Sequence, residues 1–439
     1  KTKNHPEPSK MLKELPKKGL VMLTYLLNSL IRLNFWPECF KTSLIKMIPK
    51  PGKDSNLISS YRPIALLSII SKIFEKLILQ EINKNSNLFP DHQFGFRKRH
   101  STIQQCHRLV DEINKTFEEK NFCSAAFLDV SQAFDKVWHE GLLKKIASTL
   151  PSNYLKFFKS YLENRKFVVK IGQDCSDSCH INAGVPQGSV LAPFLYLLYT
   201  SDIPTLTSST IATFADDIAI LAVARDAKLA SCRLQTHLNL IERWAETWKI
   251  KINDSKSQHI TFTLNKESCP PVTFYNNQIP ECKSIKYLGM HLDRKLTWKP
   301  HIVAKIKQIN LKLKELHWLL NRKSKLSLEN KVLLYKTIII PVWSYGIELW
   351  GCASKSNTAM IQRTQSKILR ILTNAPWYVT NRTIHTDLGI SFIQDVIKSR
   401  SINHHNKLTE HPNPTLAPLL TNSGSRRLKR TWPSNLIDS

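Results

Sequence analysis

The chain has 439 residues, of which 42% are hydrophobic and 22% charged, a balance typical of globular proteins and not of disordered or collagen-like chains. Its 63 Lys and Arg residues outnumber 34 Asp and Glu residues, so the formal net charge is +29. A compact protein with this excess repels itself unless a polyanion neutralises it, which indicates a nucleic-acid partner. No run of about 18 uncharged apolar residues occurs in the sequence, so we expect no transmembrane helix and no membrane partner.

Hydrophobic spacing and turn residues predict a mixture of helices and strands. In chain order, the expected elements are a helix over 20–33, a strand over 45–48, helices over 68–82 and 102–117, a strand over 125–129, a helix over 142–150, a hairpin of 166–172 with 180–183, a helix over 191–199, strands over 211–214 and 218–223, and helices over 229–250 and 301–320. Because helices and strands do not alternate regularly, we expect an α+β fold rather than a doubly wound sheet.

The nine cysteines are scattered and odd in number, which indicates a reducing compartment rather than a disulfide framework. Cys175, Cys179 and His180 lie close together in the sequence, like the start of a zinc site. No second ligand pair follows at the spacing of a zinc finger, so we interpret this segment as a hairpin loop. The chain begins with Lys1 and no apolar signal segment follows, and we expect it to be a piece of a longer product.

Two adjacent carboxylates, Asp216 and Asp217, stand between apolar strands in the segment Phe214-Ala215-Asp216-Asp217. An ordinary polar turn is one interpretation, because Asp is common in turns. The apolar residues on both sides favour another: two like charges in such a place are unfavourable unless a cation neutralises them. The pair is therefore a candidate metal site.

A third carboxylate, Asp129, ends the predicted strand 125–129. A strand end can aim a side chain at a ligand from rigid backbone, although a helix N-cap is an alternative role. One strand-end carboxylate and an Asp pair suit two-metal phosphoryl transfer. Mg²⁺ uses few protein carboxylates and completes its shell with water and phosphate, so three suffice.

A turn with two glycines, Gly184-Val185-Pro186-Gln187-Gly188, leads into the apolar helix 191–199. Glycine lets the backbone approach a ligand closely, and the Gln187 side chain can both donate and accept a hydrogen bond. Alone, the turn is equally typical of any loop-to-helix junction.

In their order and contexts these three segments resemble the polymerase motifs of reverse transcriptases, specifically those of jockey-type non-LTR retrotransposons. The resemblance covers roughly residues 15 to 400. The other segments in the family's order are Tyr61-Arg62-Pro63-Ile64, Gln93-Phe94-Gly95-Phe96-Arg97, Trp248-Lys249-Ile250-Lys251-Ile252-Asn253, Tyr287-Leu288-Gly289 and Ala375-Pro376-Trp377-Tyr378-Val379.

The resemblance implies a right-hand polymerase of fingers, palm and helical thumb. It implies an RNA-directed DNA polymerase that copies the element's RNA template with deoxynucleoside triphosphates, from the 3′ hydroxyl of a DNA primer supplied by nicked target DNA. In such elements an endonuclease domain normally lies upstream, and no segment here resembles it. Priming on chromosomal DNA implies action in the nucleus as well as presence in the cytoplasm.

The expected domains are a helical lead-in over 1–30, a reverse transcriptase domain of fingers and palm over 31–293, a helical thumb and C-terminal region over 294–400, and a loosely ordered tail over 401–439, rich in Pro, Asn and Ser. Four thumb lysines could contact a duplex backbone, although a solvated helix face is the commoner role: Lys305, Lys307, Lys312 and Lys314. The aromatic segment 343–350 could stack bases, but a hydrophobic core is the better interpretation.

The resemblance also implies roles for single residues. Asp129, Asp216 and Asp217 are expected to bind two Mg²⁺ ions, or Mn²⁺, and Val130 to add its backbone carbonyl. Phe134 is expected to lie under the incoming sugar, where an aromatic ring excludes a 2′ hydroxyl. A core aromatic is the alternative role for Phe134.

For the nucleotide, Gln187 and Gly188 are expected to shape the pocket. Lys50, Lys53 and Arg62 are candidates for holding the triphosphate, because cations stabilise charge on a transferring phosphoryl group. Each of these three is otherwise a solvated surface charge.

Two further candidates follow in the chain. Lys256 matches a lysine that could protonate the departing pyrophosphate, or it is a solvated turn lysine. Tyr287, Leu288 and Gly289 are similar to a primer grip, which holds the nascent 3′ end.

Two other functions are compatible with these motifs. One is a catalytically degenerate, RNA-binding remnant of such an element, which the three intact aspartates disfavour. The other is a sister polymerase, such as a group II intron maturase or a telomerase-like enzyme, which the segment Ala375–Val379 disfavours.

Overall fold

The computed structural model describes residues 12–84, 88–420 and 426–437. The chain folds into two compact units, each assembled from several stretches of sequence. The first unit comprises the chain as far as Pro90, Val130–Pro204 and Ile241–Ile252, and the second comprises Asp91–Asp129, Thr205–Leu240 and the chain from Asn253. The domain limits expected at residues 30, 293 and 400 stay predictions, and residues 1–11 of the expected lead-in lie outside the described residues.

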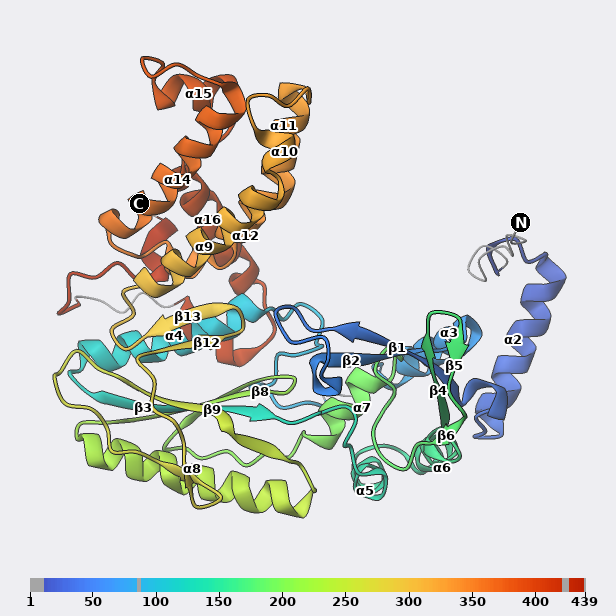
Figure 1. Ribbon diagram of the computed structural model, residues 1–439. Coiled ribbons are helices and arrows are strands. Elements are labelled where there is room, and N and C mark those ends of the chain that lie inside the picture. Colours follow the sequence, from blue (N-terminus) through green and yellow to red (C-terminus); the bar gives the residue numbers. More distant parts are fainter. Residues whose placement is uncertain (1–11, 85–87, 421–425, 438–439) are drawn as a thin grey trace. The chain divides into compact units, whose positions relative to one another are not determined.

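The first unit contains a five-stranded mixed sheet in the order β2-β1-β4-β5, with β6 also paired to β4 (Figure 1). Its strands are β1 (Thr42–Pro49), β2 (Tyr61–Leu66), β4 (Lys166–Ile171), β5 (Asp174–Cys175) and β6 (Cys179–His180). Its helices are α2 (Lys17–Arg32), η1 (Glu38–Phe40), η2 (Ile58–Ser60), α3 (Ile69–Ile82), α5 (His139–Thr149), α6 (Ser152–Leu162) and α7 (Ala192–Tyr199). The antiparallel pairing of β4 with β6 confirms the hairpin interpretation of the Cys-Cys-His segment.

An aromatic cluster fixes the helices of this unit to one another. The Trp36 ring is fully buried and stacks on Phe74 of α3, with ring centroids 4.9 Å apart. It meets Phe157 and Tyr161 of α6 edge to face, at 5.6 and 4.9 Å. Such pairs contribute about 0.5–1.5 kcal/mol beyond the area they bury, so the cluster is a rigid support for α3.

The second unit is built on a four-stranded sheet in the order β7-β8-β3-β9. The strands are β3 (Phe122–Val130), β7 (Thr210–Phe214), β8 (Asp217–Ala224) and β9 (Ile252–Phe262). Helices α4 (Thr102–Glu118) and α8 (Ala227–Thr247) cover opposite faces of the sheet (Figure 1). Side chains of β3 alternate accordingly, because successive strand residues point to opposite faces: Cys123 and Phe127 join the core on the α4 side, and Phe122 joins a cluster with Ala230 of α8. Strands β3, β7 and β8 and both helices were predicted and are confirmed, whereas β9 was not predicted.

Two small hairpins and a helical region complete the second unit. The hairpins are β10 (Thr273–Phe274) with β11 (Asn277–Gln278) and β12 (Ser284–Tyr287) with β13 (Met290–Asp293). The helices are α9 (Lys299–Glu315), α10 (His317–Leu320), α11 (Leu328–Leu334), η3 (Tyr335–Ile339), α12 (Ile340–Ser344), α13 (Ile347–Trp350), α14 (Lys355–Thr373), α15 (Asn381–Asp387), α16 (Ile393–Thr409), η4 (Pro414–Leu419) and η5 (Pro433–Ile437).

Three expectations about this helical region can be compared with the structure. Trp343 and Trp350 are fully buried, so the core interpretation is confirmed. Lys305 was expected among duplex-contacting lysines, but it is buried and its ammonium lies 5.0 Å from the centre of the Tyr345 ring. The tail expected to be loose differs too: α16 continues to Thr409, and Trp432 is buried. Residues 421–425 and 438–439 of that tail lie outside the described residues.

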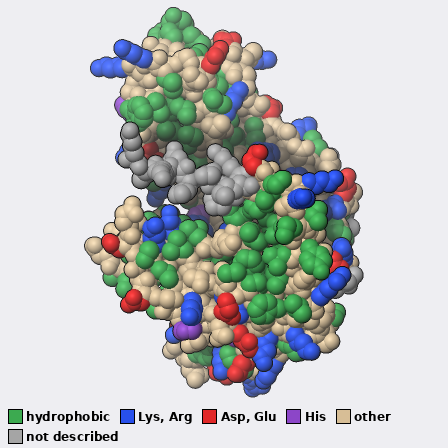
Figure 2. All heavy atoms as spheres, turned by 90° about the vertical axis from the view of Figure 1, so that its right-hand side faces the viewer, with side chains coloured by type: hydrophobic (Ala, Val, Ile, Leu, Met, Phe, Trp, Pro, Cys, Tyr) green, Lys and Arg blue, Asp and Glu red, His purple; other side chains and the backbone are tan. Residues whose placement is uncertain are grey.

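Helix α2 exposes much of its apolar surface. The predicted helical spacing is confirmed, but of its leucines only Leu27 and Leu30 are buried. Leu20, Met22 and Tyr25 are exposed. Figure 2 shows hydrophobic side chains gathered on the face that lies on the right of Figure 1, where α2 is labelled. Among the described helices, none is long and apolar enough to cross a membrane.

Candidate active site

Strand pairing brings two of the three predicted aspartates together. Asp129 at the end of β3 lies directly opposite Asp217 at the start of β8, in antiparallel register. Residues paired in this way have Cα atoms about 4.5–5.5 Å apart. Phe214 pairs with Asp217 across the β7–β8 hairpin, so Asp216 lies in the two-residue turn beside them. The carboxylates predicted from separate motifs are therefore neighbours at one end of the two central strands of the sheet.

A buried glutamine holds the turn that carries Asp216. The Gln93 Oε1 accepts hydrogen bonds from the backbone N–H groups of Ala215 (2.9 Å) and Gly95 (2.8 Å). Ala215 has a φ of +56°, in the left-handed region. Gly95 is required by close approach, because a Cβ there would lie 2.2 Å from the Ala215 nitrogen. Sequence reasoning quoted this motif but assigned Gln93 no role; a polar residue beside a glycine in a motif was the available signal.

The carboxylates repel one another in this structure. Burial, together with the charges of Asp216 and Asp129, raises the pKa of Asp217 from 3.8 to about 6. The Lys256 ammonium on β9 lies 3.7 Å from Asp129 Oδ2 and offsets part of this repulsion. The Asp129 backbone N–H donates to Ser257 Oγ at 3.3 Å, which fixes the strand end.

The predicted primer-grip turn borders a cavity that two of the aspartates also line. A cavity of about 110 Å³ in the second unit is lined by Asp129, Asp217, Lys256 and Tyr287, among others. Tyr287 is buried and its hydroxyl donates to the Ala212 carbonyl at 3.3 Å. Burial raises the pKa of Tyr287 well above its ordinary value, so the ring is a neutral hydrogen-bond donor.

The turn after Tyr287 is held by a distant tyrosine. Leu288 and Gly289, with φ of +45° and +80°, reverse the chain between β12 and β13. The Tyr345 hydroxyl donates to the Leu288 carbonyl at 2.7 Å. This partner lies 57 residues further along the chain, so a tertiary contact fixes the conformation of the turn.

The predicted nucleotide-pocket residues lie in the first unit. The Phe134 ring stacks on Tyr196 of α7, with centroids 5.0 Å apart, and its carbonyl accepts from the Val185 N–H at 2.8 Å. The Gln187 carbonyl accepts from the Ala65 N–H of β2 at 2.7 Å. The structure thus brings Phe134 and the Gln187 turn together.

Gly188 has a φ of +120°, and a Cβ there would lie 2.6 Å from the Ala65 carbonyl oxygen, so a side chain does not fit. A cavity of about 380 Å³ lies between the sheet and this turn, lined by Ile45, Phe167 and Gln187, among others. Glycine here allows β2 and the turn to pack in contact.

Sequence reasoning missed the residue beneath this turn, Glu75 of α3. Its buried carboxylate accepts from the backbone N–H groups of Val190 (2.5 Å) and Leu191 (3.2 Å), where α7 begins. Burial raises the pKa of Glu75, and these two hydrogen bonds and the Arg165 guanidinium oppose the rise. The available signal was a glutamate next to Phe74 on the face of the predicted helix 68–82 that also carries Ile78.

The predicted triphosphate ligands Lys50 and Arg62 lie at one end of the β1–β2 pair. Arg62 pairs with Ile48 across the strands and is exposed. The Lys50 ammonium donates to the Ser59 carbonyl at 2.8 Å, which holds it on its own hairpin. Lys53 follows in the exposed turn.

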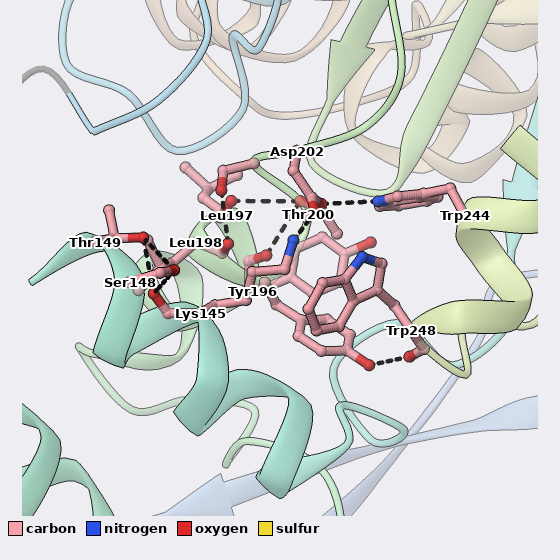
Figure 3. Close-up of polar contacts among 12 residues, drawn as sticks. Lys145, Ser148, Thr149, Tyr196, Leu197, Leu198, Thr200, Asp202, Trp244 and Trp248 are labelled. Carbon is pink, nitrogen blue, oxygen red and sulfur yellow. Dashed lines mark hydrogen bonds and ion pairs between the residues drawn. The ribbon is translucent and has the colours of Figure 1, made fainter. Parts of the chain in front are cut away.

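The Trp248 motif has a structural role in the first unit (Figure 3). The buried Lys145 ammonium of α5 lies 3.8 Å from the centre of the Trp248 ring and forms an ion pair with Asp202. The Trp244 indole donates to the same carboxylate at 2.8 Å, and the Tyr199 hydroxyl donates to the Trp248 carbonyl. The cluster joins α5, α7 and the last turn of α8, which supports the helix carrying Tyr196.

Comparison with known proteins identifies relatives for most of the chain. A family model described as reverse transcriptase (RNA-dependent DNA polymerase) matches residues 48–292. The probable RNA-directed DNA polymerase from transposon X-element of Drosophila melanogaster is 41% identical over 97% of this chain and 48% of its own length. The RNA-directed DNA polymerase from mobile element jockey of Drosophila funebris is 38% identical over 98% of this chain and 49% of its own. The chain spans about half the length of these curated relatives.

Among solved structures, apo telomerase from Candida tropicalis is similar with a TM-score of 0.42 and 13% identity, covering 93% of this chain and 73% of that chain. Because this TM-score is low, family membership rests on the sequence relatives. The functions expected of single site residues stay predictions.

Proposed function

Because the chain belongs to the reverse transcriptase (RNA-dependent DNA polymerase) family, we propose that it is the polymerase of a jockey-like non-LTR retrotransposon and copies RNA into DNA. The observation that carries the proposal is the register of β3 and β8, which places Asp129 opposite Asp217 with Asp216 in the adjoining turn. Three carboxylates from two separate motifs meet there although they repel one another.

The donor set of this site fits magnesium. Carboxylate oxygens, with the Val130 carbonyl next to Asp129, are hard ligands of the kind Mg²⁺ prefers, and Mn²⁺ accepts the same set. Within the described ranges no three acidic, His or Cys side chains lie so that they could hold a metal by themselves, so water and nucleotide phosphates would have to complete the shell of a bound ion. Bound ions would activate the primer 3′ hydroxyl and stabilise the leaving pyrophosphate.

The chain's own residues supply positioning and charge. Asp129, Asp216 and Asp217 would hold the reacting groups at a rigid strand edge. Lys256, near Asp129 and with an exposed side chain, would donate a proton to the departing pyrophosphate from its ammonium Nζ. Tyr287, kept neutral by burial, would support the primer end.

The residues of the first unit would bind the nucleotide. Lys50 and Arg62 would carry the triphosphate charge, and Gln187 and Gly188 would shape the pocket. Phe134, packed on Tyr196, would exclude the 2′ hydroxyl of a ribonucleotide.

The proposed substrates are an RNA template, a DNA primer or nicked target strand, and deoxynucleoside triphosphates. An endonuclease domain elsewhere in the whole protein would produce the nick. Because the primer is chromosomal, we propose action in the nucleus following synthesis in the cytoplasm.

Primer extension on an RNA template with Mg²⁺ and deoxynucleotides tests this function. Wild-type extension that disappears in Asp216→Asn, with RNA binding retained, is the expected result. Asp174→Asn, an exposed aspartate on β5, is the matched control and should extend normally. RNA binding without any extension by the wild type would instead favour a degenerate RNA-binding remnant.

A further inference from the structure

Two large aromatic side chains stand almost fully exposed on the loop between α14 and α15. Trp377 is 89% and Tyr378 68% exposed. The conformation of the loop is nevertheless fixed, because the Arg370 guanidinium of α14 donates to the carbonyl oxygens of Pro376 (3.0 Å) and Val379 (2.5 Å) on either side of the pair. A loop that is held by hydrogen bonds at both ends and still exposes two aromatic rings to water indicates an interaction site.

The loop's surroundings are basic. Arg363, Lys367 and Arg370 follow one another at i, i+4 and i+7 of α14, so they share one face that leads to the loop, and Arg382 stands in the first turn of α15. Arg363, Lys367 and Arg382 are exposed. Residues 355–386 contain no Asp or Glu, so this face attracts anions.

We propose that Trp377, Tyr378 and the stripe Arg363-Lys367-Arg370 form a docking surface for unpaired RNA, separate from the aspartate site; naming the template as that RNA rests on the proposed function. Exposed aromatic rings stack on unpaired bases while neighbouring cations neutralise phosphates. A protein partner fits less well for two reasons. The cores of protein interfaces are depleted of lysine, and a protein partner would have to present aspartate or glutamate side chains to match this basic face.

Photocrosslinking locates such contacts. The purified chain is irradiated with an unstructured RNA of roughly 15 nucleotides that carries 5-iodouridine, and the adducts are mapped by mass spectrometry. Adducts on Trp377 or Tyr378 are expected, and Trp377→Ala with Tyr378→Ala should weaken RNA binding roughly 30-fold or more, because two rings that stack on bases are lost. Trp377→Phe with Tyr378→Phe should restore binding, and Tyr25→Ala, which removes an equally exposed tyrosine of α2, should not change it.

The outcomes separate this inference from the proposed function. RNA adducts elsewhere, with normal primer extension and no effect of the double alanine variant, would overturn the docking surface and leave the polymerase standing. Adducts on the loop in a chain that extends no primer would support the RNA surface and overturn the polymerase. A change of oligomeric mass in the double variant without loop adducts would show that the aromatic pair binds protein, and would overturn the inference.

Discussion

Removing the Glu75 carboxylate should destabilise the backbone at the start of α7. In Glu75→Ala, the buried N–H groups of Val190 and Leu191 lose their acceptor. Each unsatisfied buried donor costs about 1–3 kcal/mol, so we expect the local structure to lose about 3–5 kcal/mol. Since about 1.4 kcal/mol corresponds to a factor of ten, amide exchange at these two residues should accelerate roughly 100- to 4,000-fold.

Hydrogen exchange resolved by mass spectrometry measures this effect where it occurs. Glu75→Gln should show a smaller acceleration, because its amide oxygen can still accept both hydrogen bonds. Glu81→Ala removes an exposed glutamate of the same helix that pairs only with Lys84 and should change nothing measurable. Unchanged exchange at residues 190–191 in Glu75→Ala would refute the reasoning, whatever the variant's activity.

Three further substitutions test the sites. Asp217→Asn should raise the melting temperature of the metal-free chain in calorimetry. Since the pKa of Asp217 in the folded state is raised from 3.8 to about 6, this rise in melting temperature should grow between those pH values and level off above pH 6. A rise that does not depend on pH would contradict repulsion among the carboxylates. Lys145→Met should cost about 2 kcal/mol by loss of a desolvated cation–π contact, measured by thermal unfolding. Lys144→Met removes a longer, exposed contact of the same kind with Trp138 and should cost less than about 1 kcal/mol. Gly95→Ala must displace Ala215 and should lower primer extension about 100-fold while RNA binding persists; activity near wild type would show that the turn can relax.

The sequence predicts those parts of the site that depend on local pattern. The strands around Asp217 follow from apolar runs, and Asp129 follows from its place at a strand end. Their meeting follows from the pairing of β3 with β8, which periodicity alone does not give; the family resemblance supplied it.

The contacts that support these residues are not local, which is why the sequence does not reveal them. Gln93 reaches Ala215 across 122 residues of sequence, and Glu75 reaches Val190 across 115. Each is a polar residue directly before or after a phenylalanine in its own segment. Its partner is a backbone N–H, which carries no signature in the side-chain sequence. The same limit explains Lys305, whose spacing matches a solvated stripe but whose ammonium lies over the Tyr345 ring.

The turn that carries Asp216 and the turn that precedes α7 are fixed by the same kinds of contact. In each, one buried side-chain oxygen accepts two backbone N–H groups. Gln93 Oε1 accepts from Ala215 of the aspartate turn and from Gly95 of its own loop, and Glu75 Oε2 accepts from Val190 and Leu191 at the start of α7. In each, a glycine lies so close to backbone that a Cβ would clash, Gly95 against Ala215 and Gly188 against β2. A left-handed alanine beside repelling carboxylates is costly by itself, and only surroundings that over-determine the backbone can hold it there. The conformation of each turn is therefore set by the distant segment that hydrogen-bonds it, and on the proposed function substitutions at Gln93 or Glu75 should lower primer extension although neither residue touches a substrate.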